Sequence, residues 1–215
     1  MNTKIVIIGA GGFGKEVLWS IIDINKLSKK YDFLGFIDDD KKLCNTKIYG
    51  HNVLGGLDWF SKNKDKNFSC VIAIGDPILR KKIVEKLSSC DLSYETIIHP
   101  SVIFSDSISI GFGTIIQAGV ILTVDTKIGN HVHININSTV GHDCNISDFV
   151  TVNPGVLVNG DTKIDEGSFL GSGVTLKDNI NLGRWSVIGA GSVLLSNAKE
   201  FSTYVGIPAK FKKRL

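Results

Sequence analysis

The sequence contains little cysteine, methionine or proline, and it has no long hydrophobic run. Its 215 residues include four cysteines, one methionine and four prolines. Cys44, Cys70, Cys90 and Cys144 show no C-x-x-C spacing, which argues against a zinc site or a disulfide framework and favours reduced, mostly buried thiols. The first apolar run ends at Gly9, far short of a signal-peptide core or a membrane span. We therefore expect a cytoplasmic protein.

Charge of one sign is not in large excess either. The net charge is +3, and no long basic run occurs before the last six residues. This balance calls for neither a nucleic acid nor a membrane partner. Glycine, in contrast, is abundant at 23 residues and is accompanied by many Ile, Val, Asn, Asp and Ser residues. Such a composition suits β-structure with many tight turns.

Strand and helix patterns alternate over residues 1–97. Short apolar runs predict strands at 4–8, 33–37, 68–74 and 94–98. Helical spacing follows at 15–22, 57–62 and 77–87, and Pro77 suits the first turn of the last of these helices. Alternating strands and helices predict a small parallel sheet of the α/β class.

From Ile98 onward the hydrophobic period changes to six. Seventeen positions spaced six apart, from Ile98 to Leu194, are all aliphatic or Phe, although only 43% of the chain is hydrophobic. A strict hexapeptide repeat is the signature of a parallel β-helix, in which three short strands make one triangular coil. We therefore predict between five and six coils, with the repeated aliphatic side chains inside. Glycine and asparagine are expected at turn positions of positive φ.

Three stretches carry a family resemblance. They are Ile7-Ile-Gly-Ala-Gly-Gly-Phe-Gly-Lys-Glu-Val17, Asn135-Ile-Asn-Ser-Thr-Val-Gly-His-Asp-Cys-Asn-Ile146 and Val205-Gly-Ile-Pro-Ala-Lys210. Together they resemble the hexapeptide-repeat acyltransferases, in the branch of nucleotide-sugar N-acetyltransferases and sialic-acid O-acetyltransferases. The resemblance implies a Rossmann-like nucleotide-sugar-binding domain, residues 1–97, followed by a left-handed β-helix acyltransferase domain, residues 98–215. It also implies acetyl-CoA as co-substrate and no metal.

His142 is the expected catalytic residue. An amine that attacks a thioester must lose a proton as the C–N bond forms, and a neutral imidazole near pH 7 suits that task. Asp143 matches the acidic residue of the family motif and is expected to fix the tautomer of the imidazole ring. Asn135 matches a family asparagine near the acceptor, although a turn asparagine is an equally good interpretation. A turn histidine on a β-helix surface is the alternative for His142.

The glycine loop resembles a dinucleotide-binding fingerprint. Gly9, Gly11 and Gly14 form G-x-G-x-x-G after a strand and before a helix, where N–H groups hold a pyrophosphate. An NAD site is disfavoured, because this half lacks the second mononucleotide-binding unit. The resemblance implies instead that the loop binds the diphosphate of a nucleotide sugar. Its other expected contacts are Gly12, Phe13, Lys15, Asp38, Asp39, Gly75 and Asp76. For the aspartate pair, a strand-ending turn is the alternative.

CoA is expected between neighbouring coils. By resemblance its contacts would be Gly160, Ser172 and Ala190, although turns also favour small residues. Thr151 stands where family members often have a second histidine, so only a hydroxyl is available there for the thioester. Arg184 and the basic residues 210–214 could meet the phosphates, and a solvated tail is the simpler interpretation.

The expected reaction is N-acetylation of a nucleotide-linked amino sugar, a 4-amino-4,6-dideoxyhexose above all, for a bacterial surface glycan such as lipopolysaccharide O-antigen. Alternatives are O-acetylation, transfer of another acyl group, and a protein that binds nucleotide sugars without catalysis. A zinc hydratase would need ligands such as His131, His133 and His142, whose spacing departs from that family's pattern. The resemblance also implies a homotrimer with active sites between subunits.

Overall fold

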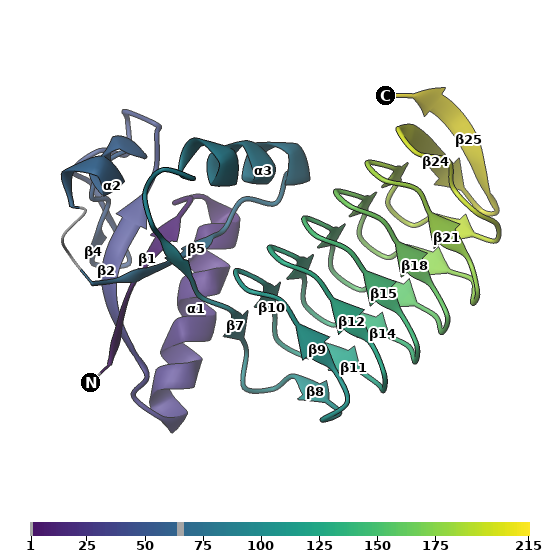
Figure 1. Ribbon diagram of the computed structural model, residues 1–215, viewed down its shortest axis with the longest axis horizontal. Helices are drawn as coiled ribbons and strands as arrows, with labels where there is room; N and C mark the ends of the chain where they lie inside the picture. The colour runs from purple at the N-terminus through teal and green to yellow at the C-terminus, as the bar shows by residue number, and fades with distance from the viewer. Residues whose placement is uncertain (1, 64–66) are drawn as a thin grey trace. The chain divides into compact units, whose positions relative to one another are not determined.

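The computed structural model describes residues 2–63 and 67–215 and divides the chain into two compact units, Met1–Pro100 and Ser101–Leu215 (Figure 1). The sequence prediction placed the boundary between residues 97 and 98. The first unit extends a few residues beyond that prediction, because His99 packs on the helix that contains Trp19. The ring centroids of His99 and Trp19 lie 5.0 Å apart. No helix in the described part of the chain is long and apolar enough to cross a membrane.

The first unit is an α/β domain with a parallel sheet. The sheet order is β2-β1-β5-β6, with β1 at Thr3–Ile8, β2 at Tyr31–Ile37, β5 at Ser69–Ile72 and β6 at Ser93–Tyr94. The helices are α1 Gly12–Leu27, α2 Asp58–Lys62 and α3 Pro77–Lys86, and β3 Lys47–Ile48 pairs with β4 His51–Asn52 as a small hairpin. Strand β1 is central, and Ile5 to Ile8 are at most 2% exposed. The predicted α/β class is confirmed.

The single strand predicted at 94–98 is wrong in one respect. The structure has two strands here, β6 and β7 (Ile97–Ile98), separated by Glu95 and Thr96. Glu95 is still held at the sheet, because its N–H donates to the Cys70 carbonyl oxygen of β5 and its carboxylate accepts from the Tyr31 hydroxyl at 2.8 Å. The first sheet thus ends at β6, and β7 belongs to a different sheet.

The second unit is a parallel β-helix built from two-residue strands. The strands are β8 Ile103–Phe104, β9 Ser109–Ile110, β10 Ile115–Ile116, β11 Ile121–Leu122, β12 Lys127–Ile128, β13 His133–Ile134, β14 Thr139–Val140, β15 Asn145–Ile146, β16 Thr151–Val152, β17 Leu157–Val158, β18 Lys163–Ile164, β19 Phe169–Leu170, β20 Thr175–Leu176, β21 Asn181–Leu182, β22 Val187–Ile188 and β23 Val193–Leu194. A hairpin of β24 Ser202–Gly206 and β25 Ala209–Arg214 follows them. The predicted β-helix is confirmed.

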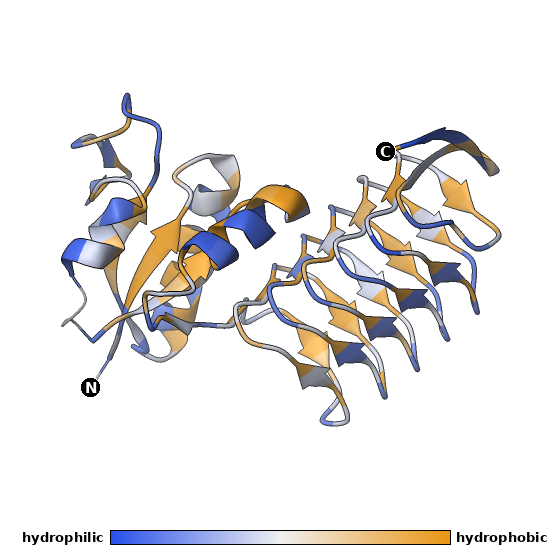
Figure 2. Cartoon of the chain, turned by 45° about the horizontal axis from the view of Figure 1, so that its top comes forward, coloured by the Kyte–Doolittle hydropathy of each residue, from blue (hydrophilic) through white to orange (hydrophobic). Residues whose placement is uncertain are grey.

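From β8 to β20, each strand pairs with the strand 18 residues further along, so the coils stack in register. Three faces result. The β10 face holds β10, β13, β16, β19 and β22, the β11 face holds β8, β11, β14, β17, β20 and β23, and the β12 face holds β9, β12, β15, β18 and β21. Figure 2 shows hydrophobic residues recurring on the strands of each coil. The hexad residues from Ile116 to Leu194 are at most 4% exposed, whereas Phe104 in the first coil is 46% exposed.

Glycine serves two different purposes in the coils. Positive φ recurs three residues after each inward aliphatic residue from Ile110 to Ile188, and Asp143 and Asn137 occupy such positions as well as Gly155. Gly171, directly after an inward residue, lacks positive φ; a Cβ there would lie 2.5 Å from the Ala190 nitrogen of the next coil. The expectation that turn glycines supply positive φ is thus only partly right, because this second group permits close stacking of the coils.

Candidate active site

His142 lies in the turn between the β11 face and the β12 face. Val140 before it and Cys144 after it are buried in the core, with at most 1% exposure. These two anchors direct the intervening side chains outward, so the His142 and Asp143 side chains are 58% and 56% exposed. Asp143 has φ +58°, and its N–H donates to the Val124 carbonyl oxygen of the preceding coil at 3.1 Å. The repeat therefore fixes the backbone of this turn and leaves the imidazole in solvent.

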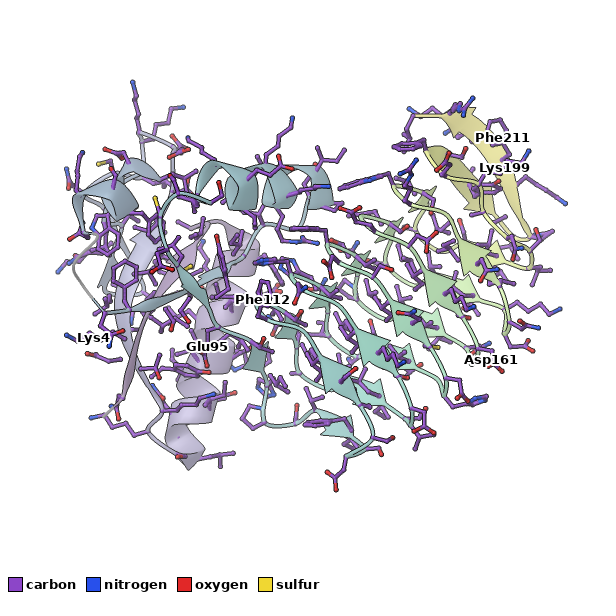
Figure 3. All side chains as sticks on the ribbon, viewed as in Figure 1. Lys4, Glu95, Phe112, Asp161, Lys199 and Phe211 are labelled. Carbon is purple, nitrogen blue, oxygen red and sulfur yellow. The ribbon has the colours of Figure 1, made fainter. Side chains whose placement is uncertain are left out.

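Asp143 determines the state of the imidazole. The His142 Nδ1 lies 2.8 Å from the Asp143 Oδ2. A carboxylate only accepts hydrogen bonds, so Nδ1 carries the hydrogen and Nε2 is the basic nitrogen. The hydrogen bond to Asp143 raises the pKa of His142 above its ordinary value, and the charges of Asp143 and Asp161 act in the same direction. Asp161 is labelled in Figure 3, at the corresponding turn of the next coil.

Gly160 lies directly against the His142 ring. A Cβ on Gly160 would be 2.5 Å from Nε2 and 2.6 Å from Cε1, so a side chain there would displace the ring. The next residue, Asp161, donates its N–H to the His142 carbonyl oxygen at 2.9 Å, which keeps the two turns stacked. The Gly160 N–H has no acceptor among the described residues. Gly160 itself is buried, and its backbone donor therefore lies beside the ring of the exposed base.

The remaining β-helix residues of the predicted site lie elsewhere. Asn135, Ser172 and Ala190 belong to the edge between the β10 face and the β11 face, one prism side away from His142. The Asn135 amide is buried and donates to the Val152 carbonyl oxygen at 2.9 Å. Thr151 is completely buried on β16. A single chain thus brings together His142, Asp143 and Gly160, while Ser172 and Ala190 form a separate group.

The histidines that a zinc hydratase would need do not form one set. His131 and His133 are buried, at 2% and 0% exposure, while His142 lies in solvent on another edge. His131 stacks on Phe149, with ring centroids 5.3 Å apart. No group of three or more His, Cys, Asp or Glu side chains in residues 2–63 and 67–215 could hold a metal ion.

The glycine loop of the first unit follows β1. Gly9 has φ +103°, and a Cβ there would lie 2.8 Å from the Ala73 carbonyl oxygen. A Cβ on Gly14 would overlap the Gly9 carbonyl oxygen. These two glycines are required by the fold. Gly11 and Gly12 differ, because a Cβ on either residue would have no atom within 4 Å and neither residue has positive φ. Their missing side chains leave open space in front of helix α1.

Helix α1 begins at this open space. Gly11 is its N-cap residue and offers no side-chain cap, and the first turn holds no acidic residue. Lys15 lies exposed in that turn, and Phe13 is half-buried. A helix N-terminus carries partial positive charge, so the uncapped start of α1 with Lys15 is suited to an anion.

A cavity of about 240 Å³ lies at the carboxyl ends of β1 and β2, beside helix α3. Leu57, Leu79 and Ile83 give it an apolar wall, and its polar groups are Asp38, Asp39, Lys82 and Lys86. Ligands of open α/β sheets bind at this end of the strands. The sequence reasoning missed both lysines; their spacing of four on a helix was the signal that could have found them.

The predicted polar residues around this cavity have different partners. Asp38 accepts the Ala10 N–H at 2.8 Å with one oxygen and the Asp40 N–H at 2.9 Å with the other. Asp39 accepts the Leu57 N–H at 2.7 Å, and its second oxygen lies 3.7 Å from the Lys86 Nζ. Asp76, which follows Gly75, caps helix α3 by accepting the Leu79 N–H, and it does not line the cavity.

The chain is similar to known proteins in both units. The model of the PglD N-terminal domain matches residues 4–87. The structure of PerB from Caulobacter crescentus in complex with CoA and GDP-perosamine is 29% identical, with a TM-score of 0.90 over 98% of this chain and 97% of that one. WeeI from Acinetobacter baumannii is 30% identical, with a TM-score of 0.87 over 98% and 100%. The chain belongs to the hexapeptide-repeat acyltransferases.

A third similar structure carries the acyl donor. The acetyltransferase domain of PglB from Neisseria gonorrhoeae, in complex with acetyl coenzyme A, is 27% identical with a TM-score of 0.89 over 99% of this chain and 100% of that one. A comparison with curated proteins gave no match. As a member of this family, the chain is a CoA-dependent N-acetyltransferase.

Proposed function

We propose that this acyltransferase moves the acetyl group of acetyl-CoA to the amine of a nucleotide-linked amino sugar, a 4-amino-4,6-dideoxyhexose in particular. The observation that carries the proposal is the His142 turn, where Asp143 orients the ring and leaves Nε2 free beside Gly160. The GDP-perosamine complex of PerB supports an acceptor of this class. A role in surface-glycan synthesis stays a prediction from the sequence.

The chemistry at His142 is proton removal. The amine nitrogen of the sugar attacks the thioester carbonyl carbon, so a C–N bond forms and the C–S bond breaks. Nε2 of His142 takes the proton that the amine loses, and CoA leaves as the thiolate, which is protonated to the thiol. Asp143 stabilises the imidazolium that forms, because its carboxylate holds Nδ1–H throughout.

The Gly160 N–H is suited to the negative charge that develops on the thioester oxygen. It has no acceptor among the described residues, and it belongs to the residue against which the His142 ring lies. A backbone donor that is already in place stabilises an oxyanion without reorganisation. Asn135 and Thr151 are buried in the single chain and have no direct role in this proposal.

The first unit supports the nucleotide part of the acceptor. Gly11 and Gly12 are not required to be glycine by their surroundings, which is expected where a ligand approaches the backbone closely. The diphosphate would lie at the start of α1 near Lys15, and the nucleoside in the cavity lined by Asp39, Leu79 and Lys86. This arrangement matches a nucleoside diphosphate better than a free sugar.

A homotrimer is part of the proposal. The outward residues of the β11 face include Ile103, Ile121 and Leu157, which are 65%, 40% and 41% exposed. The corresponding residues of the β12 face include Lys127 and Lys163. An apolar face beside a charged face favours packing of the β11 face against another subunit. Because His142 follows a strand of the β11 face, such packing would place it at the subunit boundary.

The test is a substrate screen with purified protein. Acetyl-CoA is combined with UDP-, dTDP- or GDP-linked 4-amino-4,6-dideoxy sugars, with the corresponding 4-hydroxy sugars and with sialic acid, and thiol release is followed. We expect turnover with at least one amino sugar and its loss in the variant His142→Ala. His51→Ala, on the hairpin of the first unit, is the matched control and should retain turnover.

Other outcomes would contradict the proposal in distinct ways. Turnover of a hydroxyl acceptor alone would replace N-acetylation by O-acetylation. Near wild-type turnover in His142→Ala would reject the general base. Light scattering that gives a monomer would reject the trimer.

A further inference from the structure

Asp38 differs from a typical ribose-binding aspartate in how its carboxylate is used. Both of its oxygens accept backbone N–H groups, from Ala10 at 2.8 Å and from Asp40 at 2.9 Å. In dinucleotide-binding folds the acidic residue after the second strand accepts a ribose hydroxyl. Here the same position is committed to the chain's own backbone.

The bond to Ala10 extends the pairing of the two strands. Ile8 and Ile37 form the last residue pair of β1 and β2, and the Gly9 N–H then donates to the Ile37 carbonyl oxygen at 2.8 Å. The chain then turns at Gly9, which has φ +103°, and the Ala10 N–H donates to the Asp38 side chain. Ala10 is 2% exposed, so no water can replace that acceptor without opening the loop.

The second oxygen acts on the segment that follows β2. It fixes Asp40, while the Asp38 N–H donates to the Gly55 carbonyl oxygen at 2.8 Å. Asp39 lies between these two anchored residues, and its own carboxylate accepts the Leu57 N–H. One side chain thus holds the loop that leads into α1 and the segment that carries Asp39.

We propose that Asp38 is a positioning residue of the nucleotide site, which acts through Ala10 and the glycine loop, and that Asp39 with Lys86 presents the charged groups to the nucleoside. The inference rests on the proposed nucleotide-sugar function. Asp38 keeps Gly11 and Gly12 at the start of α1 in the geometry that receives the diphosphate. Asp38 therefore affects the binding affinity of every ligand that contains a diphosphate, whatever sugar or ribose hydroxyls that ligand carries.

The experiment compares Asp38→Asn with Asp32→Asn, a matched control at an exposed aspartate of β2, the strand that Asp38 follows. Asparagine keeps one acceptor oxygen but turns an amide NH₂ toward the other N–H group, so one of the two bonds is lost. Competitive inhibition is measured with the nucleoside diphosphate that binds the wild type most tightly, with its 2′-deoxy and 3′-deoxy analogues, and with inorganic pyrophosphate. Steady-state constants are measured for the nucleotide sugar and for acetyl-CoA.

We expect Asp38→Asn to weaken the binding of all the diphosphates by the same factor, about tenfold, which corresponds to about 1.4 kcal/mol. The KM of the nucleotide sugar should rise by a similar factor, while kcat and the KM of acetyl-CoA stay unchanged. Asp32→Asn should match the wild type, and Asp38→Ala, which removes both acceptors, should be worse than Asp38→Asn.

Three results would overturn the inference. Affinity equal to that of the wild type would show that the loop does not need Asp38. A loss that disappears with one deoxy analogue would assign Asp38 to direct contact with that hydroxyl. A fall in kcat together with a higher KM for both acetyl-CoA and the nucleotide sugar would indicate a general structural role. If the wild type itself binds no nucleoside diphosphate, the proposed function fails, and this inference with it.

Discussion

Val124, His142 and Gly160 occupy the same place in three successive coils, and each is followed by an aspartate with positive φ, Asp125, Asp143 and Asp161. Aspartate tolerates the left-handed region better than most residues, so the turn alone accounts for its presence. What distinguishes the middle turn is the residue before the aspartate. The repeat supplies the backbone and the carboxylate, and a single substitution in the repeat supplies the base.

The residue in the next coil completes the comparison. Gly160 leaves space for the His142 ring, whereas a valine as at position 124 would fill it. The site is therefore a pair of departures from the repeat in adjacent coils, one that adds an imidazole and one that removes a side chain. Each can be changed without altering the strands, which makes the comparison testable residue by residue.

The largest effect is expected for His142→Ala. Loss of a general base typically costs about 10²–10⁴-fold in rate. We expect kcat to fall in that range while the KM of both substrates changes little, because the ring in the proposed mechanism removes a proton and binds neither substrate tightly. Steady-state kinetics of thiol release measure this. If Val124→Ala in the preceding coil reduced turnover equally, the comparison between the turns would be wrong.

Gly160→Ala should give the next largest effect. The added Cβ would lie 2.5 Å from Nε2, and the ring is the group that can yield, because its side chain is exposed. Displacement of a catalytic group by about 1 Å can cost about 10²-fold in rate. We expect such a loss in kcat with an unchanged melting temperature. Gly155→Ala, with no atom near its Cβ but positive φ, is a contrasting variant that should lower stability and spare kcat.

The β-helix could be predicted from the sequence almost residue by residue. Each aliphatic hexad residue must lie inside a prism whose coils repeat every 18 residues, so the positions from Ile116 to Leu194 are determined by period alone. The same reasoning located the His142 turn. It could not show that Gly160 lies under the ring for a steric reason, since glycine is common in turns for several reasons.

Contacts between distant segments were beyond the reach of sequence patterns. The partner of Asp38 is the backbone of Ala10, 28 residues earlier, and no local spacing indicates it. The burial of the Asn135 amide, which donates to the Val152 carbonyl oxygen, and of the Thr151 side chain depends on neighbouring coils, so motif matching could not show it. Lys82 and Lys86 reach the cavity at the carboxyl ends of β1 and β2 only because α3 packs beside the sheet.

Asp143→Asn should change both rate and pH dependence. The hydrogen bond to Asp143 raises the pKa of His142, and the base works only when neutral, so kcat/KM falls as the pH drops through that pKa. Asparagine removes the charge, which lowers the pKa, and the acid limb should move to lower pH. Weaker control of the ring should also reduce the plateau of kcat by about tenfold. Asp125→Asn, one coil earlier, should leave the profile unchanged.

Asp161→Asn should give the smallest effect, and it tests how far the comparison between coils extends. Asp161 makes no hydrogen bond to the His142 ring in the described structure, but its charge also raises the pKa of His142. Without that charge the acid limb of kcat/KM should move to lower pH by less than in Asp143→Asn, with the plateau preserved, because Asp143 still orients Nδ1. The pH–rate profiles of the two variants, measured side by side, check this order. A lower plateau in Asp161→Asn would mean that the next coil positions the ring as well as surrounding it with charge.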